Sequence, residues 1–368
     1  MNDLVEPTWP TVLSGLVARR DADRRTTAWA MRQILAGLAT PAQIAGFVMA
    51  LRTKGETVDE IVGLAETMLD FATPLEIGGH AVDVVGSGGD RANTVNISTM
   101  AAIVAAGAGA RVVKHGNRAA SSASGAADVL EALGVVLDVV PEDQQRVVDT
   151  AGIAFLFAPL YHPAMRHAGL VRRELGVATV FNFLGPLANP AQPSAQAVGV
   201  ADVRVAELVA GVLARRGNQG LVVHGGDGLD ELTTTSASTV WVHRDGAVVR
   251  TAFDPLDLGI ARAVPDDLVG GDPQHNAAVA RDLLAGRTGP VRDVVLLNAA
   301  AALVAHEGPD AGDLTAQLAL QLDVAREAVD SGAAARTLDV WVQATRDARS
   351  ARARGCGAPR PGRAPAGP

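Results

Sequence analysis

Short apolar runs alternate with helical patterns from residue 81 onward, and this alternation restricts the fold more than any other feature of the sequence. Strands that alternate with helices form a mostly parallel sheet with helices packed against it. We therefore expect strands at 81–85, 111–114, 153–157, 197–200 and 220–224, then a hairpin at 239–243 and 248–253. Helices are expected at 100–109, 126–133, 274–286, 290–306, 313–331 and 336–348. Such a sheet binds ligands beyond the carboxyl ends of its strands.

The first 75 residues carry helix signals instead of strand signals. Thr40-Pro41 has the pattern of an N-cap followed by Pro in the first helical turn. Thr57 and Glu60 have capping-box spacing ahead of a periodic apolar run. The helical pattern ends at Thr73-Pro74. We therefore predict an all-helical domain at 1–75 and a larger α/β domain at 76–349.

The end of the chain differs in composition. Residues 350–368 hold four Arg, four Pro and no acidic residue, without apolar periodicity. Such a segment cannot bury enough surface to offset its ordering entropy. The sequence therefore predicts a disordered Arg/Pro-rich tail at 350–368.

Charge and composition exclude several classes of protein. The 368 residues have a formal net charge of −8, and the tail holds four of the positive charges, so the folded part is more acidic still. An acidic body is a poor general binder of nucleic acid. The single cysteine, Cys356, excludes an intrachain disulfide framework. The sequence has no long apolar stretch and no basic leader pattern, so we expect a cytoplasmic protein without a membrane span.

A glycine-rich turn, Gly86-Ser-Gly-Gly-Asp90, follows the first predicted strand. Its backbone N–H groups can converge on an anion because glycine carries no Cβ. The turn matches neither GxGxxG nor GxxxxGK[ST], so a simple tight connection is the alternative. The next segment, 93–99, opens a predicted helix, and a helix N-terminus stabilises phosphate. Ser98 and Thr99 are either phosphate ligands there or N-cap residues only.

A second loop, from Lys114 to Gly125, contains two strong cations, an amide and several hydroxyl side chains between a strand and a helix. Lysine suits phosphate as a point charge, and arginine suits carboxylate or phosphate as a planar fork. This mixture favours a phosphate-binding and ribose-binding loop over the alternative, a solvated surface loop.

A third loop, at 157–165, leads into a predicted helix that carries the adjacent pair Arg172-Arg173. One arginine of such a pair usually faces solvent or a weak surface ion pair. Arg172 is our candidate for the ligand cleft. His162 is either a titratable group of the site or a structural hydrogen-bonding residue.

Two adjacent carboxylates, Asp230 and Glu231, follow a glycine-containing turn after the fifth predicted strand. Mg²⁺ prefers hard oxygen ligands and substrate phosphates. The phosphate loops predicted nearby make the pair a candidate magnesium site. Chance neighbours on an exposed turn are the alternative.

Seven segments, taken in order, resemble the anthranilate phosphoribosyltransferase family of the nucleoside phosphorylase class II-like phosphoribosyltransferases. They are GSGGD at 86–90, NIST at 96–99, KHGNRAASS at 114–122, SGAADVLEALG at 124–134, HPAMRH at 162–167, RRELGVATVFNFLGPLANP at 172–190 and HGGDGLDE at 224–231. The resemblance spans about residues 10–345. It implies a small helical domain, joined by a helical insertion around 167–190, and a larger α/β domain, with the substrate cleft between them.

The resemblance implies transfer of phosphoribosyl from 5-phosphoribosyl 1-diphosphate to the amine of anthranilate, with release of pyrophosphate. This reaction is the second step of tryptophan biosynthesis from chorismate. Mg²⁺ as cofactor and a homodimer formed through the helical domain are implied as well. The neutral aromatic amine is already nucleophilic, so we nominate no strong general base.

By resemblance, the phosphoribosyl diphosphate site comprises Gly86, Gly88, Gly89, Asp90, Thr94, Asn96, Ser98, Thr99, Lys114, Asn117 and Ser122. The anthranilate site comprises Gly86, His115, Asn117, Pro159, His162, Met165 and Arg172, with Arg172 facing the carboxylate. The expected Mg²⁺ ligands are Ser98, Asp230 and Glu231. Lys114, His115, Asn117 and Arg172 are expected to support catalysis by neutralising charge and aligning the reactants.

Arg91 departs from the family pattern, which commonly has glycine after GGD. We expect this residue to affect the mobility of the glycine-rich loop and its affinity for the donor. Three alternatives stay open: a paralogue for a substituted anthranilate, an enzyme like pyrimidine nucleoside phosphorylase, and a non-catalytic nucleic-acid-binding relative. The KHGNR and HPAMRH segments argue against an enzyme like pyrimidine nucleoside phosphorylase. The acidic body and the Asp230-Glu231 pair argue against a nucleic-acid-binding relative.

Overall fold

The computed structural model describes residues 6–119 and 123–355. In this part of the chain, seven strands form one sheet in the order β3-β2-β1-β4-β5-β6-β7. The strands are β1 Val82–Gly86, β2 Val112–Gly116, β3 Ile153–Phe157, β4 Ala195–Gly199, β5 Gln219–Gly225, β6 Ser238–Arg244 and β7 Ala247–Phe253. The first five pair in parallel, and β5, β6 and β7 pair antiparallel. The predicted mostly parallel sheet with a late hairpin is therefore confirmed.

Successive strand residues alternate between the hydrophobic clusters on the two faces of the sheet. Val84 lies in one core and Val85 in the other, and Val222 and Val223 alternate in the same way. This pattern follows from the two-residue period of a strand, and a parallel sheet buries both faces under helices. One face is covered by α5 Ile97–Gly107, α6 Ala126–Leu133, α7 Pro141–Ala151, α11 Pro273–Leu284, α12 Pro290–Glu307, α13 Leu314–Asp330 and α14 Ala333–Gly355. The other face contacts α10 Val203–Arg215 and the N-terminal helices.

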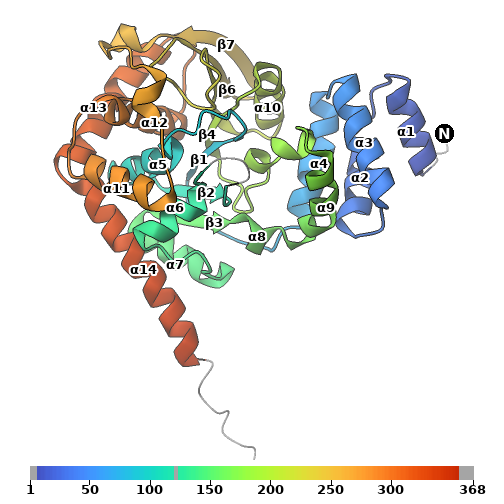
Figure 1. Cartoon of the computed structure of the whole chain (residues 1–368), viewed down its shortest axis with the longest axis horizontal. Coiled ribbons are helices and arrows are strands. Elements are labelled where there is room, and N and C mark those ends of the chain that lie inside the picture. The colour runs from blue at the N-terminus through green and yellow to red at the C-terminus, as the bar shows by residue number, and fades with distance from the viewer. Residues whose placement is uncertain (1–5, 120–122, 356–368) are drawn as a thin grey trace, which may run out of the picture.

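Four helices form the N-terminal unit, at one side of the molecule (Figure 1): α1 Trp9–Val17, α2 Arg24–Leu35, α3 Pro41–Lys54 and α4 Val58–Asp70. Capping boxes at Thr40 and Thr57 begin α3 and α4, as the sequence predicts. Later elements join this unit: α8 Ala158–Tyr161, α9 Arg166–Leu175, and the 3₁₀ turns Pro163–Met165, Val180–Asn182 and Gly185–Leu187. α9 packs against α2 and α3, so the segment around 167–190 lies beside the N-terminal helices.

The C-terminal helix corrects one prediction. α14 continues to Gly355 and projects from the body in Figure 1. Disorder from residue 350 is therefore wrong for 350–355. Alanine and arginine, which fill most of this stretch, are good helix formers, and glycine and proline follow only from Gly355 on. An established helix can extend through such residues without burying them. The rest of the predicted tail, 356–368, lies outside the described residues.

Gly63 in α4 marks a close approach between two N-terminal helices. A Cβ at this position would lie 2.3 Å from both the backbone oxygen of Arg24 and Oγ1 of Thr27 in α2. We expect Gly63→Ala to lower the free energy of unfolding by about 1–3 kcal/mol, because α2 must shift to make room. Urea denaturation measures this change.

Gly46→Ala is the matched control for Gly63→Ala. A Cβ at Gly46, inside α3, would lie no closer than 3.6 Å to Cδ2 of Leu13, which is ordinary van der Waals contact. This variant should be neutral or gain up to about 1 kcal/mol from helix propensity. Equal stability of the two variants would contradict the packing described for α2 and α4.

Candidate active site

Five parallel strands end at one edge of the sheet, and the predicted phosphate and metal segments lie there. The glycine-rich loop follows β1, the Lys114 segment occupies the end of β2, and the turn that carries Asp230 and Glu231 follows β5. Segments far apart in the sequence therefore meet at the edge where open parallel sheets bind ligands.

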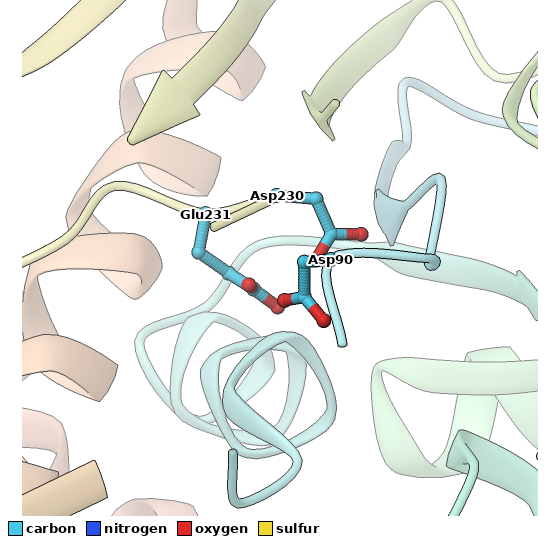
Figure 2. Close-up of side chains that lie close together, drawn as sticks. All are labelled: Asp90, Asp230 and Glu231. Carbon is cyan, nitrogen blue, oxygen red and sulfur yellow. The ribbon is translucent and has the colours of Figure 1, made fainter. Parts of the chain in front are cut away.

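Three carboxylates converge at this edge. One oxygen each from Asp90, Asp230 and Glu231 lies within 4.8 Å of the others. Figure 2 shows the three side chains gathered at one place. The N–H of Gly88 donates a hydrogen bond to Oδ2 of Asp230 at 2.7 Å, which ties the loop after β1 to the turn after β5.

Two glycines make room for Asp230. A Cβ at Gly86, the last residue of β1, would lie 2.2 Å from Oδ2 of Asp230. A Cβ at Gly199, the last residue of β4, would lie 1.4 Å from the backbone oxygen of Asp230. No side chain fits at either position while Asp230 keeps its place.

The electrostatics of the three carboxylates favour a cation. Burial and the neighbouring Asp230 charge raise the pKa of Asp90 to about 6, and burial and the same neighbour raise the pKa of Glu231 well above its ordinary value. Oε2 of Glu231 is buried and has no hydrogen-bond partner in the described part of the chain. Clustered hard oxygen ligands, one of them unsatisfied, fit a divalent cation such as Mg²⁺.

Lys114 places a buried ammonium group beside this site. Its Nζ donates to the backbone oxygen of Val84 and, at 3.3 Å, to Oγ of Ser98. Burial lowers the pKa of Lys114 to about 8, against the opposing pull of Asp83, Glu231 and Asp230. The lysine therefore stays mostly charged at neutral pH and offers a fixed positive charge to an anion.

The loop after β1 has an unusual backbone. Gly88 and Gly89 have φ angles of 68° and 87°, in the left-handed region that glycine tolerates. Arg91 and Asn93 are also left-handed, with φ angles of 62° and 53°. The resemblance implies glycine at position 91. The left-handed φ angle gives a physical reason, because a side chain adds strain in this conformation.

The start of α5 is held by side-chain contacts. Asn96 precedes the helix without capping it, and its Oδ1 accepts a hydrogen bond from Nδ2 of Asn276 at 2.9 Å. Thr94 forms an isolated β-bridge with Val269. Oγ1 of Thr99 is buried and has no hydrogen-bond partner among the described residues. The helix N-terminus therefore keeps polar groups that a phosphate could satisfy.

Two buried histidines form a second part of the site. The rings of His115 and His162 meet edge to face, with centroids 5.3 Å apart. Nδ1 of His115 lies 3.3 Å from the backbone oxygen of Gly185, and Nε2 of His162 lies 2.8 Å from that of Ala188. Burial lowers the pKa of His115 to about 3 and also lowers the pKa of His162. Both rings are neutral at pH 7, and each carries its proton on the nitrogen that faces a carbonyl.

The remaining predicted residues lie on the segments that follow β2 and β3. Asn117 and Pro159 are exposed, and Met165 packs against the core shared with the N-terminal helices. Arg172 is exposed, and its guanidinium carbon lies 5.7 Å from the centroid of the Phe181 ring. Ser122 lies outside the described residues.

Sequence reasoning missed two polar residues that support the site. Asp83 is fully buried in β1, and Asn189 donates from Nδ2 to its Oδ2 at 2.8 Å. The sequence signal for Asp83 is its position as a carboxylate inside the apolar run Ala81–Val85. The resemblance implies a phosphate-binding role for Asp90, and its position beside Asp230 makes it a candidate metal ligand as well.

Comparison with known proteins agrees with this geometry. Residues 10–72 match the Glycosyl transferase family, helical bundle domain, and residues 78–335 match the Glycosyl transferase family, a/b domain. The chain is 59% identical over 339 residues to the anthranilate phosphoribosyltransferase of Arthrobacter sp. (strain FB24), across 92% of this chain and 96% of that protein. The chain belongs to the anthranilate phosphoribosyltransferase family. The membership that the seven segments predict is confirmed.

Solved structures of the anthranilate phosphoribosyltransferase family share the fold. The enzyme from Thermus thermophilus superimposes with a TM-score of 0.84 at 41% identity, over 91% of this chain and 99% of that one. The Saccharomyces cerevisiae enzyme in complex with PRPP and Mg gives 0.82 at 26% identity, over 92% and 98%. The predicted fold class, a helical unit plus a larger α/β unit, is confirmed.

The carboxylate cluster predicts a pH-dependent stability. The pKa of Asp90 rises from 3.8 to about 6 on folding, so the native state binds this proton more tightly and loses stability as the pH rises through that window. Asp90→Asn removes the loss. We therefore compare the free energy of unfolding of Asp90→Asn with that of the unsubstituted protein, both without Mg²⁺. Allowing for the partial exposure of Asp90, we expect the difference to change in favour of the variant by about 1 kcal/mol from about pH 4 to about pH 7.

Denaturant unfolding across this pH range measures the effect. A constant difference for Asp90→Asn would contradict the charge repulsion described for the cluster.

Proposed function

We propose that this chain transfers the phosphoribosyl group of 5-phosphoribosyl 1-diphosphate to the amine of anthranilate, forming N-(5-phosphoribosyl)anthranilate and pyrophosphate. The observation that carries the proposal is the convergence of three carboxylates with the buried Lys114 at the ends of the parallel strands. Relatives named anthranilate phosphoribosyltransferase, at 59% and 57% identity over nearly their whole length, support it. The reaction is the second step of tryptophan biosynthesis from chorismate.

The donor side of the site suits departure of pyrophosphate. Cleavage of the bond between ribose C1 and pyrophosphate builds negative charge on the leaving group. Asp90, Asp230 and Glu231 would hold Mg²⁺, which would supply positive charge to neutralise the phosphates when bound. Lys114 adds a fixed ammonium group, and the backbone at Gly88 and Gly89 carries no Cβ atom that would obstruct a phosphate. Together these groups lower the barrier electrostatically.

The acceptor side suits a neutral amine. Because Nδ1 of His115 donates to Gly185, its Nε2 is an acceptor, and this nitrogen is buried without a partner among the described residues. It can accept a hydrogen bond from the amine N–H and direct the nitrogen lone pair towards ribose C1. The neutral ring aligns the acceptor and need not take a proton before attack. Arg172 is proposed to pair with the anthranilate carboxylate.

Assembly and location are further proposals. Large apolar side chains are exposed on the N-terminal unit, among them Val17 and Leu38, and a homodimer through this unit would bury such surface. Sedimentation equilibrium would test the dimer. Within the described residues, every helix is too short or too polar to cross a bilayer. We propose that the protein acts in the cytoplasm, where its substrates are metabolites.

The proposed activity is tested by the loss of anthranilate fluorescence. Purified protein is mixed with 5-phosphoribosyl 1-diphosphate, Mg²⁺ and anthranilate, with each component omitted in turn and with substituted anthranilates in parallel. We expect fluorescence to fall only in the complete mixture and fastest with plain anthranilate. No loss of fluorescence would overturn the proposal. Faster loss with a substituted anthranilate would make that compound the acceptor in place of anthranilate.

Glu231→Gln should weaken the magnesium dependence. The amide keeps the shape of the side chain and removes one anionic ligand, so we expect kcat/KM at limiting Mg²⁺ to fall about tenfold or more and to recover partly at higher Mg²⁺. Steady-state rates over a magnesium titration measure this. Glu207→Gln, on the exposed side of α10, is the control and should match the unsubstituted enzyme. An unchanged titration for Glu231→Gln would remove this residue from the metal site.

The adjacent arginines offer a matched pair of variants. Arg172→Ala should raise the KM for anthranilate about tenfold with a smaller change in kcat, because a charge-assisted contact to the carboxylate is lost. Arg173→Ala, one residue along α9 and also exposed, should change the KM less than about twofold. Initial rates at saturating donor measure both. Equal effects of the two substitutions would contradict the assignment of Arg172.

A further inference from the structure

Asp83 is a buried charge that the proposed mechanism leaves unused. It is the second residue of β1, a strand flanked by β2 and β4, and its side chain is inaccessible to solvent. Burying a carboxylate in such a place is unfavourable unless its oxygens are hydrogen-bonded, and more unfavourable than burying a neutral polar group. Its retention inside an apolar strand points to a specific role.

The contacts of Asp83 bridge three segments. Oδ1 accepts a hydrogen bond from the backbone N–H of His115 at 3.2 Å, and Oδ2 accepts one from Nδ2 of Asn189 at 2.8 Å. The same Nδ2 donates to the backbone oxygen of Val113 at 2.8 Å. One carboxylate thus joins β1, β2 and the segment that follows the Gly185–Leu187 turn.

The pairing of the strands explains why a side chain reaches the His115 N–H. β1 and β4 are in register at five positions, and so are β2 and β3, whereas β1 and β2 are aligned only at Val82 and Val112. The ladder between β1 and β2 therefore opens beyond its first pair. The carboxylate of Asp83 occupies this opening and takes the N–H that a regular ladder would pair with a carbonyl.

The segment 185–189 carries the carbonyls that hold both histidines. The oxygen of Gly185 faces Nδ1 of His115, and the oxygen of Ala188 faces Nε2 of His162. Asn189 follows directly and is anchored by Asp83. Movement of Asn189 would displace the two carbonyls that fix the tautomer and direction of the rings.

We propose that Asp83 is a positioning residue for the acceptor side of the site: by binding the His115 N–H and Asn189 together, it holds the histidine rings against the 185–189 segment. The catalytic consequence of this role rests on the proposed function. Both partners of Asp83 are donors, so an acceptor-only carboxylate is required. An amide in its place would turn a donor towards one of them.

The test compares Asp83→Asn and Asn189→Ala with a control on the same strand. Val82→Ala shortens a fully buried side chain of β1 and leaves the hydrogen bonds of Asp83 intact. We expect both test variants to raise the KM for anthranilate about tenfold, and Asn189→Ala to change the Kd for 5-phosphoribosyl 1-diphosphate with Mg²⁺ by less than about twofold. Asp83→Asn also removes a charge that stabilises the Lys114 ammonium group, so donor affinity is compared in Asn189→Ala. Val82→Ala should lower stability and leave both constants unchanged. Asn189→Ala keeps the test available if Asp83→Asn does not fold.

A second readout requires no substrate. Imidazole ¹⁵N chemical shifts report the tautomers of His115 and His162, and they should change in both test variants and not in Val82→Ala. If the unsubstituted protein makes no product, the proposed function fails while these shifts still test the positioning role. Unchanged shifts with an unchanged KM, or a parallel loss of donor binding in Asn189→Ala, would overturn the proposal for Asp83.

Discussion

The close contact between Asp230 and the ends of β1 and β4 is the constraint on which the site depends. Gly86 and Gly199 leave space that any side chain would fill, and Asp230 occupies it. Its hydrogen bond from Gly88 then fixes the glycine-rich loop against the turn after β5. Because β4 lies between β1 and β5, the contact joins loops from two strands that do not pair with each other. The carboxylate cluster exists only while this contact holds.

The site concentrates charge that the folded protein would otherwise avoid. Burial and mutual repulsion raise the pKa of Asp90 and Glu231, and burial lowers the pKa of Lys114. Each shift means that the charged form is less stable in the native state than in water. A divalent cation and a diphosphate would relieve both effects, since the cation balances the carboxylates and the phosphates balance the lysine. The electrostatics of the site therefore favour a cation beside the carboxylates and an anion beside Lys114.

Much of the fold followed from local patterns, and much of the site did not. Alternating apolar runs and the caps at Thr40 and Thr57 depend on neighbours in sequence, so the strands and helices could be predicted. Gly86 could be recognised as part of a phosphate turn, but the atom that requires glycine there belongs to Asp230, far along the chain. The tautomers set by Gly185 and Ala188 depend likewise on tertiary contacts. Apolar periodicity indicates only helices that bury one face, so it does not predict the extension of α14 to Gly355.

The proposed donor site rests on the contact of Asp230 with the glycine-rich loop. Isothermal titration calorimetry of 5-phosphoribosyl 1-diphosphate, with and without Mg²⁺, tests it in the unsubstituted protein and in Gly86→Ala. We expect Mg²⁺-dependent binding that Gly86→Ala weakens at least about tenfold, because a Cβ there displaces Asp230. Equal affinity in the two proteins would contradict it.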